Sequence, residues 1–228
     1  MSNKADPLQL GQMLQQGLDG LGMVISQAGR DRLIKFLLLL ERWNRTYNLT
    51  ALRDPEQMLR RHLLESLALL PWLHGSKLLD MGSGAGLPGI PLAIARPGLD
   101  FRLIESVGKK VRFMNHVVRS LELTNVTVEQ QRLEDLPPLR EADILTARGL
   151  AGLGQICRWA EPLLAPGGSI LCLKGPAIDQ ELDEVAGAFT VSSLESLAIP
   201  GLPASSHLVI IQRSQQEPGE NALTSAEQ

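Results

Sequence analysis

The first third of the chain places its apolar side chains at the spacing of a helix. From Leu33 to Tyr47, apolar and aromatic residues recur at i, i+3, i+4 and i+7, the period of an amphipathic helix. Asp54-Pro55-Glu56 has the form of a helix start, with a capping acid followed by proline at the first helical position. A second apolar stripe runs from Met58 to Leu70. The pattern predicts a helical N-terminal region over residues 1–75.

Beyond Gly75-Ser76 the pattern changes to short apolar runs that alternate with helical segments. Five of these runs are predicted strands: Lys77–Met81, Phe101–Glu105, Val126–Gln130, Asp143–Thr146 and Ser169–Leu173. Helices are predicted between them, including Val107–Leu121 and Gly154–Leu164. Alternating strands and helices indicate a doubly wound α/β fold with a parallel sheet.

The end of the chain departs from this alternation. Thr190–Ile199 and His207–Gln212 read as two strands joined by a turn rich in Pro, Gly and Ser, which predicts an antiparallel hairpin at one edge of the sheet. The predicted α/β domain therefore covers residues 76–214. The tail, residues 215–228, is polar and poor in apolar residues, so we expect disorder there.

A glycine-rich turn follows the first predicted strand. Asp80 ends the apolar run, and Gly82, Gly84 and Gly86 follow at alternate positions before a helical segment. A dinucleotide-binding G-x-G-x-x-G would need a glycine where Leu87 stands. Asp-x-Gly-x-Gly-x-Gly instead resembles motif I of the class I methyltransferases, which bind S-adenosylmethionine. That cofactor carries a sulfonium and no pyrophosphate, so an acid beside the turn is useful and a phosphate cradle is not. We expect Gly82 and Gly84 to let backbone amides approach the cofactor closely; a purely structural turn is the alternative.

Further cofactor contacts are expected where the next strands end. Glu105 ends the second strand, where it would accept hydrogen bonds from ribose hydroxyls or be a solvated carboxylate. Leu133 and Glu134 follow the third strand, at a bend that could hold an adenine ring. Arg148 follows the fourth strand and is expected to point into the ligand crevice, where it would contact cofactor or substrate, or else form a buried structural ion pair. Leu87 is expected to pack against the cofactor.

Several motifs taken together resemble one family closely. They follow its order along the chain: Trp43 to Thr50, Arg61 to Ser66, Asp80 to Pro91, Glu105 to Lys110, Arg148-Gly149 and Leu173 to Gly175. The family is RsmG, also called GidB, the bacterial small-subunit rRNA guanine-N7 methyltransferases, and the resemblance runs from about Leu33 to Gln212. It implies S-adenosylmethionine as cofactor and 16S rRNA or the small ribosomal subunit as partner. The family's cofactor contacts fall here on Gly82, Leu87, Leu133, Glu134 and Arg148, although Gly149 replaces the alanine that usually follows the arginine.

The reaction that the resemblance implies is transfer of a methyl group to N7 of a guanine. Methylation of an exocyclic amine usually draws on an Asn/Asp-Pro-Pro-aromatic motif after the fourth strand, and Thr146-Ala147-Arg148 is no such motif. N7 has an in-plane lone pair and no proton to lose, so direct in-line attack needs no general base. We therefore name no catalytic residue, and expect Arg148 and Lys174 to position guanine O6 or a phosphate.

Basic side chains cluster at two places that the resemblance connects with RNA. They are Arg61 on the N-terminal helix and Lys109, Lys110 and Arg112 on a helix beside the crevice. Clusters of this size are more commonly a solvated helix face, but with the resemblance we expect phosphate contacts that fix register without reading sequence. For Asn44, Asn48 and His62 we favour structural roles.

Composition limits the remaining possibilities. The net charge of −3 shows that any RNA contact must come from a local patch. Cys157 and Cys172 fit neither a redox nor a zinc motif, so we expect reduced core cysteines and no metal. The N-terminus lacks the apolar segment of a signal peptide, and we expect a cytoplasmic monomer without a membrane partner. Three rivals stay open: a small-molecule or protein methyltransferase, a non-enzymatic cofactor-binding module, and a nicotinamide oxidoreductase that Leu87 already weakens.

Overall fold

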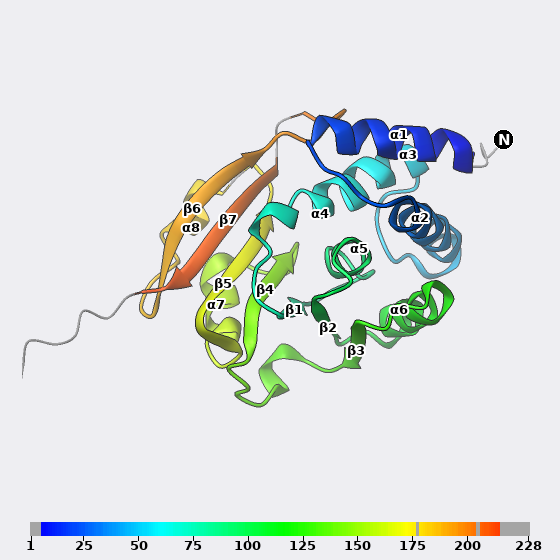
Figure 1. The fold of residues 1–228 in the computed structure, drawn as a ribbon. Helices are drawn as coiled ribbons and strands as arrows, with labels where there is room; N and C mark the ends of the chain where they lie inside the picture. The colour runs from blue at the N-terminus through cyan, green and yellow to red at the C-terminus, as the bar shows by residue number, and fades with distance from the viewer. Residues whose placement is uncertain (1–5, 177, 204–205, 215–228) are drawn as a thin grey trace, which may run out of the picture.

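Seven strands form one sheet in the computed structural model, which describes residues 6–176, 178–203 and 206–214. The strands are β1 (Lys77–Met81), β2 (Asp100–Glu105), β3 (Val126–Gln130), β4 (Ala142–Arg148), β5 (Leu164–Lys174), β6 (Phe189–Leu197) and β7 (Ser206–Arg213). Their order is β3-β2-β1-β4-β5-β7-β6 (Figure 1). The first five are parallel, and β7 runs antiparallel to both β5 and β6. The predicted doubly wound sheet and its terminal hairpin are confirmed.

The register of the central strands decides which residues meet at the carboxyl edge of the sheet. Met81 at the end of β1 pairs with Ile104 of β2 and with Ala147 of β4. The residues that come next, Gly82, Glu105 and Arg148, therefore lie side by side. Ligands of doubly wound sheets bind at this edge.

The N-terminal region is helical, as predicted. It consists of α1 (Pro7–Gly20), α2 (Gln27–Tyr47), α3 (Pro55–Met58), the π-helix η1 (Leu59–Leu64), α4 (Glu65–Leu67) and the 3₁₀ turn η2 (Leu70–Trp72). The side chain of Asp54 accepts a hydrogen bond from the backbone N–H of Gln57, which confirms the expected cap. The predicted second stripe is also confirmed, since Met58, Leu63 and Leu67 are fully buried. The π-helical turn inside it was not expected.

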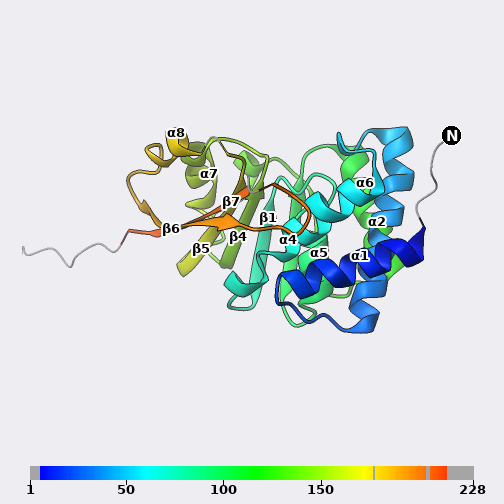
Figure 2. The ribbon, with the colours of Figure 1, turned by 90° about the horizontal axis from the view of Figure 1, so that it is seen from above.

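Helices cover both faces of the sheet (Figures 1 and 2). α5 (Gly89–Ala95) and α6 (Gly108–Leu121) lie with the N-terminal helices, whereas α7 (Leu153–Ala160) and α8 (Asp179–Leu182) lie on the other face. The prediction of a helix to Leu164 was wrong, because α7 ends at Ala160 and Leu164 already begins β5. Pro162 provides the reason, since it has no N–H to continue the helical hydrogen bonds.

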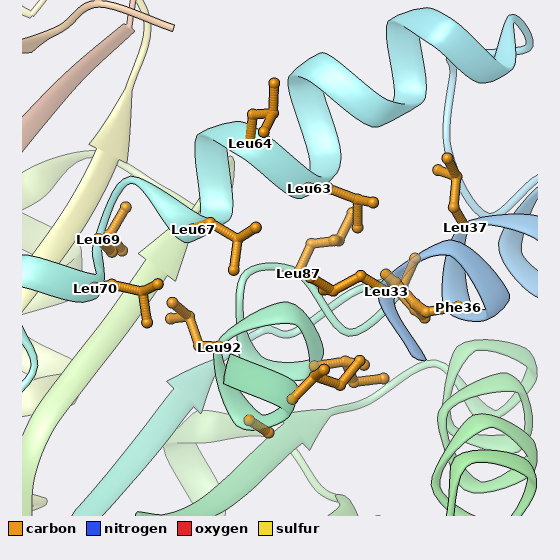
Figure 3. Close-up of a cluster of buried hydrophobic side chains, with 14 of the residues drawn as sticks. Leu33, Phe36, Leu37, Leu63, Leu64, Leu67, Leu69, Leu70, Leu87 and Leu92 are labelled. Carbon is orange, nitrogen blue, oxygen red and sulfur yellow. The ribbon is translucent and has the colours of Figure 1, made fainter. Parts of the chain in front are cut away.

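The larger hydrophobic cluster joins the N-terminal helices to the sheet (Figure 3). Leu33 and Leu37 of α2 and Leu63 of η1 are fully buried in it, together with Leu92 of α5. Complete burial of such a side chain stabilises the fold by about 1.5–3 kcal/mol. Because the core is continuous across residue 75, the division of the chain into regions 1–75 and 76–214 stays a prediction. The predicted disordered tail, 215–228, lies outside the described residues.

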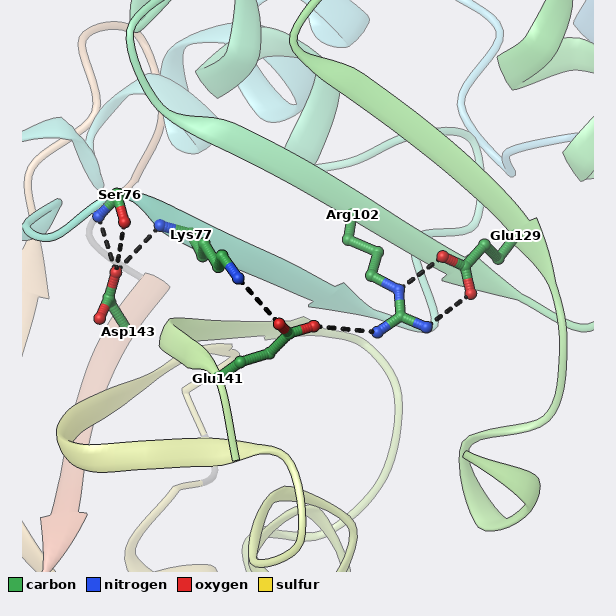
Figure 4. A network of polar contacts seen from close by, with 6 residues as sticks. All are labelled: Ser76, Lys77, Arg102, Glu129, Glu141 and Asp143. Carbon is green, nitrogen blue, oxygen red and sulfur yellow. Dashed lines mark hydrogen bonds and ion pairs between the residues drawn. The ribbon is translucent and has the colours of Figure 1, made fainter. Parts of the chain in front are cut away.

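Ion pairs connect the sheet away from its carboxyl edge (Figure 4). Asp143 accepts hydrogen bonds from the backbone N–H groups of Ser76 at 2.7 Å and Lys77 at 3.0 Å, and these bonds lower the pKa of its carboxyl. The ammonium of Lys77 lies 2.8 Å from the carboxylate of Glu141. Exposed pairs of this kind contribute little to stability. Because these residues lie away from the carboxyl edge of the sheet, variants of them can serve as controls for variants of the site.

Candidate active site

The turn after β1 is built from glycines in the left-handed region. Gly82, Gly84 and Gly86 have φ values of +64°, +59° and +79°, which side chains adopt only with strain. The N–H of Ser83 donates to the carbonyl of Ile104 at 2.9 Å and fixes the turn against β2. A side chain at Gly84 would meet nothing nearer than the carbonyl oxygen of Gly82 at 3.9 Å. The turn thus offers open space at Gly84, whereas Gly82 and Gly86 are packed closely against Leu150 and Ile90.

The side chain of Asp80, at the start of this turn, is buried inside the protein. Its carboxyl is fully buried and accepts hydrogen bonds from the Thr146 hydroxyl at 2.8 Å and the Gly89 N–H at 3.2 Å. Burial raises the pKa of Asp80 to about 6, although these hydrogen bonds oppose the increase. Asp80 thus lies at the start of the turn, and its two oxygens hold β4 and the start of α5 together.

Glu105 lies at the turn, as its register predicted. Its carboxylate accepts hydrogen bonds from the N–H of Gly84 at 2.9 Å and of Val107 at 2.8 Å. The ammonium of Lys110 lies 3.4 Å from the same carboxylate. A carboxylate offers about four acceptor positions, so Glu105 can hold the glycine turn and still accept bonds from ribose hydroxyls.

The other predicted cofactor contacts differ in their accessibility. Leu87 is 9% exposed and belongs to the larger hydrophobic cluster (Figure 3), so its packing against the cofactor stays a prediction. Leu133 and Glu134 lie on the 3₁₀ turn Leu133–Asp135 after β3. Leu133 is half-buried against the second hydrophobic cluster, and Glu134 is exposed. Both positions are compatible with the edge of an adenine site.

Arg148 is held by the N-terminal helical region. Its Nη2 donates to the carboxylate of Glu65 at 2.5 Å and to the carbonyl of Arg61 at 2.6 Å. The other oxygen of Glu65 accepts a hydrogen bond from the hydroxyl of Ser206 on β7. The Nη1 atom of Arg148 is buried and has no hydrogen-bond partner within the described residues. The ion-pair interpretation of Arg148 is thus confirmed, and its contact with cofactor or substrate stays a prediction.

A cleft of about 690 Å³ opens beside Arg148 at the carboxyl ends of β4 and β5. Arg61, Glu65 and Ser206 line it together with Arg148 and Lys174. The ammonium of Lys174 lies 2.5 Å from the carbonyl of Ala151 and 2.5 Å from the carboxylate of Glu181. Glu65, Ser206 and Glu181 were not singled out in the sequence. For Glu65 a signal existed, because it is an acid within the segment that carries the predicted apolar stripe from Met58 to Leu70.

The predicted RNA-binding residues fall into two groups in space. Arg61 lines the cleft, whereas Lys109, Lys110 and Arg112 lie on the first turns of α6. Arg112 is exposed and Lys109 half-buried, while Lys110 is drawn towards Glu105.

The two asparagines and the histidine have structural surroundings. Asn44 donates to the carbonyl of Leu52 at 2.7 Å and accepts from the N–H of Thr50 at 2.9 Å, and Asn48 ends α2 in the left-handed region. Asn44 thus fastens the loop after α2. His62 contacts the Thr50 hydroxyl at 2.9 Å. Burial, together with the charge of Arg148, lowers the pKa of His62 to about 3, so its ring is neutral at pH 7.

Both cysteines are buried and free, as expected. Burial raises the pKa of Cys157 to about 11 and that of Cys172 to about 12, so neither is an activated nucleophile. Within the described residues, no cluster of three His, Cys, Asp or Glu side chains is arranged to hold a metal ion. A separate search of the described helices finds none with the length and apolar character needed to span a membrane.

The sheet order, the glycine turn and the carboxylate at the end of β2 define a class I S-adenosylmethionine-dependent methyltransferase. The chain belongs to the GidB family, described as rRNA small subunit methyltransferase G, whose model matches residues 30–209. The expected family and cofactor are confirmed, and the protein is a methyltransferase that uses S-adenosylmethionine.

Curated relatives align over almost their whole length. The ribosomal RNA small subunit methyltransferase G of Stenotrophomonas maltophilia (strain K279a) is 45% identical over 92% of this chain and 99% of its own. That of Alteromonas mediterranea is 42% identical over 90% of this chain and 97% of its own. Among solved structures, PH0226 protein from Pyrococcus horikoshii OT3 has a TM-score of 0.55 at 15% identity, covering 76% of this chain and 99% of its own. That likeness supports the fold alone.

Proposed function

We propose that this protein transfers the methyl group of S-adenosylmethionine to N7 of a specific guanine in 16S rRNA of the small ribosomal subunit. The relatives that align with nearly the whole chain are named for methylation of small-subunit ribosomal RNA. The observation that carries the proposal is the cleft beside the glycine turn, which presents the cations Arg148 and Lys174. These cations suit a purine oxygen or a phosphate.

The contents of the cleft favour a target atom that needs no activation. The residues that line it within the described chain include no cysteine and no histidine, and the carboxylates of Glu65 and Glu181 are engaged by Arg148 and Lys174. When bound, S-adenosylmethionine supplies a methyl group on a sulfonium, which N7 of guanine attacks in line with its own lone pair. No general base is required, because N7 carries no proton.

The chain's own contribution is therefore to hold the guanine in line. Arg148 Nη1 is buried and available as a donor, and guanine O6, next to N7, is an acceptor. Alignment of two reactants in this way can contribute about 7–11 kcal/mol. Arg148 and Lys174 are accordingly proposed as positioning residues. The residues proposed around the cofactor are Gly82, Gly84, Leu87, Glu105, Leu133 and Glu134, together with Arg148.

The two groups of basic residues are proposed to bind the RNA backbone. Arg61 would contact phosphates at the cleft, and Lys109, Lys110 and Arg112 would do so along α6. Contacts of this kind position the RNA and weaken steeply with salt. We further propose that the protein acts as a monomer in the cytoplasm, with either free 16S rRNA or the small subunit as its substrate.

The test is a transfer assay with methyl-labelled S-adenosylmethionine and small-subunit rRNA from cells that lack this gene. Free rRNA and intact small subunits are assayed in parallel, and the product is digested to nucleosides. We expect the label in 7-methylguanosine. Label in another nucleoside would contradict the N7 chemistry, and label only in small molecules or protein would favour the rival class of methyltransferase.

A further inference from the structure

The two terminal nitrogens of the Arg148 guanidinium have different surroundings. Nη2 is fully used, since it donates to Glu65 at 2.5 Å and to the carbonyl of Arg61 at 2.6 Å. Nη1 is buried and lacks a partner within the described residues. Native proteins rarely leave a buried donor of a charged group unpaired. The unpaired atom therefore points to an acceptor that belongs to a bound molecule.

The carboxylate of Glu65 is the group that creates this difference. Glu65 is 5% exposed, and each of its oxygens has its own partner. One accepts the hydrogen bond from Arg148, and the other accepts that from Ser206 on β7. The side chain thus ties the N-terminal helical region to two strands of the sheet, and it cannot rotate without loss of one bond.

A widened helical turn completes the arrangement. Arg61 and its neighbours form the π-helix η1, which leads into Glu65. π-Helical turns are rare and frequently occur at functional sites. Here the turn presents the Arg61 carbonyl and the Glu65 carboxylate to the same nitrogen of Arg148. Within the described residues, the protein therefore holds the guanidinium through hydrogen bonds of Nη2.

We propose that Glu65 is a positioning residue, which holds Arg148 so that Nη1 faces an acceptor oxygen of the bound reactants. Two sources share this chemistry: the carboxylate or a ribose hydroxyl of the cofactor, and O6 of the target guanine. The second source rests on the function proposed above. Glu65 touches neither reactant in this proposal and acts through Arg148.

The test is a double-mutant cycle with two readouts. Glu65→Ala, Arg148→Ala and the double variant are compared with the wild-type protein in methyl transfer to rRNA and in calorimetric titration with S-adenosylmethionine. A misplacement of about 1 Å can cost on the order of 100-fold in rate, so Glu65→Ala should lower kcat/KM by about that factor. The double variant should be no worse than Arg148→Ala alone, because Glu65 acts only through the arginine.

A conservative variant separates positioning from stability. Glu65→Gln retains an oxygen for Arg148 and an amide N–H for the Ser206 oxygen. Its kcat/KM should therefore be about tenfold higher than that of Glu65→Ala and about tenfold lower than that of the wild-type protein, and it should fold even if Glu65→Ala does not. Glu141→Gln is the matched control, since it breaks a carboxylate pair at the amino ends of the strands. Its kcat/KM and Tm should stay near the wild-type values.

The two readouts distinguish the two sources of the acceptor. A weaker Kd for S-adenosylmethionine assigns Nη1 to the cofactor, and an unchanged Kd with a raised KM for rRNA assigns it to the guanine. The proposal is overturned if Glu65→Gln and any folded Glu65→Ala stay within twofold of wild type in both readouts, or if the losses of Glu65→Ala and Arg148→Ala multiply in the double variant. If the wild-type protein methylates no rRNA, the proposed function fails. A weaker Kd of the Glu65 variants for S-adenosylmethionine then still supports the role of Glu65, and an unchanged Kd overturns it.

Discussion

Asp80 shows how the buried turn should respond to pH. Burial raises the pKa of its carboxyl from 3.8 to about 6. Such a group binds its proton more tightly in the folded than in the unfolded chain. Its stabilising contribution is therefore fully present below pH 3.8 and is lost as the pH rises through about 6. Each pH unit between the two pKa values corresponds to about 1.4 kcal/mol, which makes the whole effect about 3 kcal/mol.

Only part of this effect falls in the pH range in which unfolding is easily measured. As the pH falls from about 8 to 5, the contribution of Asp80 to the free energy of unfolding should increase by about 1.4 kcal/mol. Asp80→Asn removes the titration. The free energy of unfolding of the wild-type protein minus that of the variant should thus increase by about 1.4 kcal/mol over this range. Urea unfolding followed by circular dichroism at several pH values measures this difference. His62 also titrates, with its pKa lowered to about 3, but its contribution is common to both proteins and cancels.

Asp143 provides the control, because its pKa is shifted in the opposite direction. Hydrogen bonds from the backbone of Ser76 and Lys77 lower the pKa of Asp143. Its stabilising contribution is present above its ordinary pKa and is lost only as the pH falls through the lowered value. The difference between wild type and Asp143→Asn should therefore be constant between about pH 8 and pH 5. A constant difference for Asp80→Asn as well would refute the assignment of Asp80 as a buried, destabilised carboxylate.

Three further changes test other parts of the site. Glu105→Gln should weaken binding of S-adenosylmethionine by on the order of 10-fold, because charge-assisted hydrogen bonds are stronger than neutral ones. Calorimetry measures the Kd, and an unchanged Kd places the ribose elsewhere. The double variant Lys109→Ala/Arg112→Ala should reduce the dependence of rRNA binding on salt, lowering the slope of log K against log salt concentration by about 1.4 to 1.8. Filter binding at several salt concentrations measures this slope, and an equal slope means that α6 does not contact the RNA. Cys157 and Cys172 should resist a thiol reagent at neutral pH and react in urea, because burial raises their pKa values to about 11 and about 12. Rapid labelling of the native protein would contradict their placement in the core.

The strands were predictable because parallel strands that are buried on both faces read as short apolar runs. Val126–Gln130 and Lys77–Met81 match the structure residue for residue. Helix ends were harder, as α7 and Leu164 show, because one proline outweighs the apolar periodicity. α1 was overlooked although its signal is present. Asp6 caps it and Pro7 follows, the same start that identified the helix after Asp54.

The site was predictable only where sequence order fixes position in space. Glu105 was found because neighbouring parallel strands end at the same edge. Glu65 was not, because it meets Arg148 across 83 residues and Ser206 across 141, contacts that depend on how the helical region packs. The direction of the Asp80 side chain was not predictable either, because it depends on Thr146 and Gly89. The sequence shows that an acid is present but not which way it faces.

The central claim is methylation of one guanine at N7, and chemical cleavage tests it most directly. Small-subunit rRNA from cells lacking the gene is incubated with the protein and S-adenosylmethionine, then treated with borohydride and aniline, which cut at 7-methylguanosine. One new cleavage in 16S rRNA is predicted, absent without the cofactor and lost or strongly reduced with Arg148→Ala. Methyl label in the RNA without any cleavage would contradict N7 as the acceptor, and absence of label from both free rRNA and intact subunits would contradict the rRNA substrate itself.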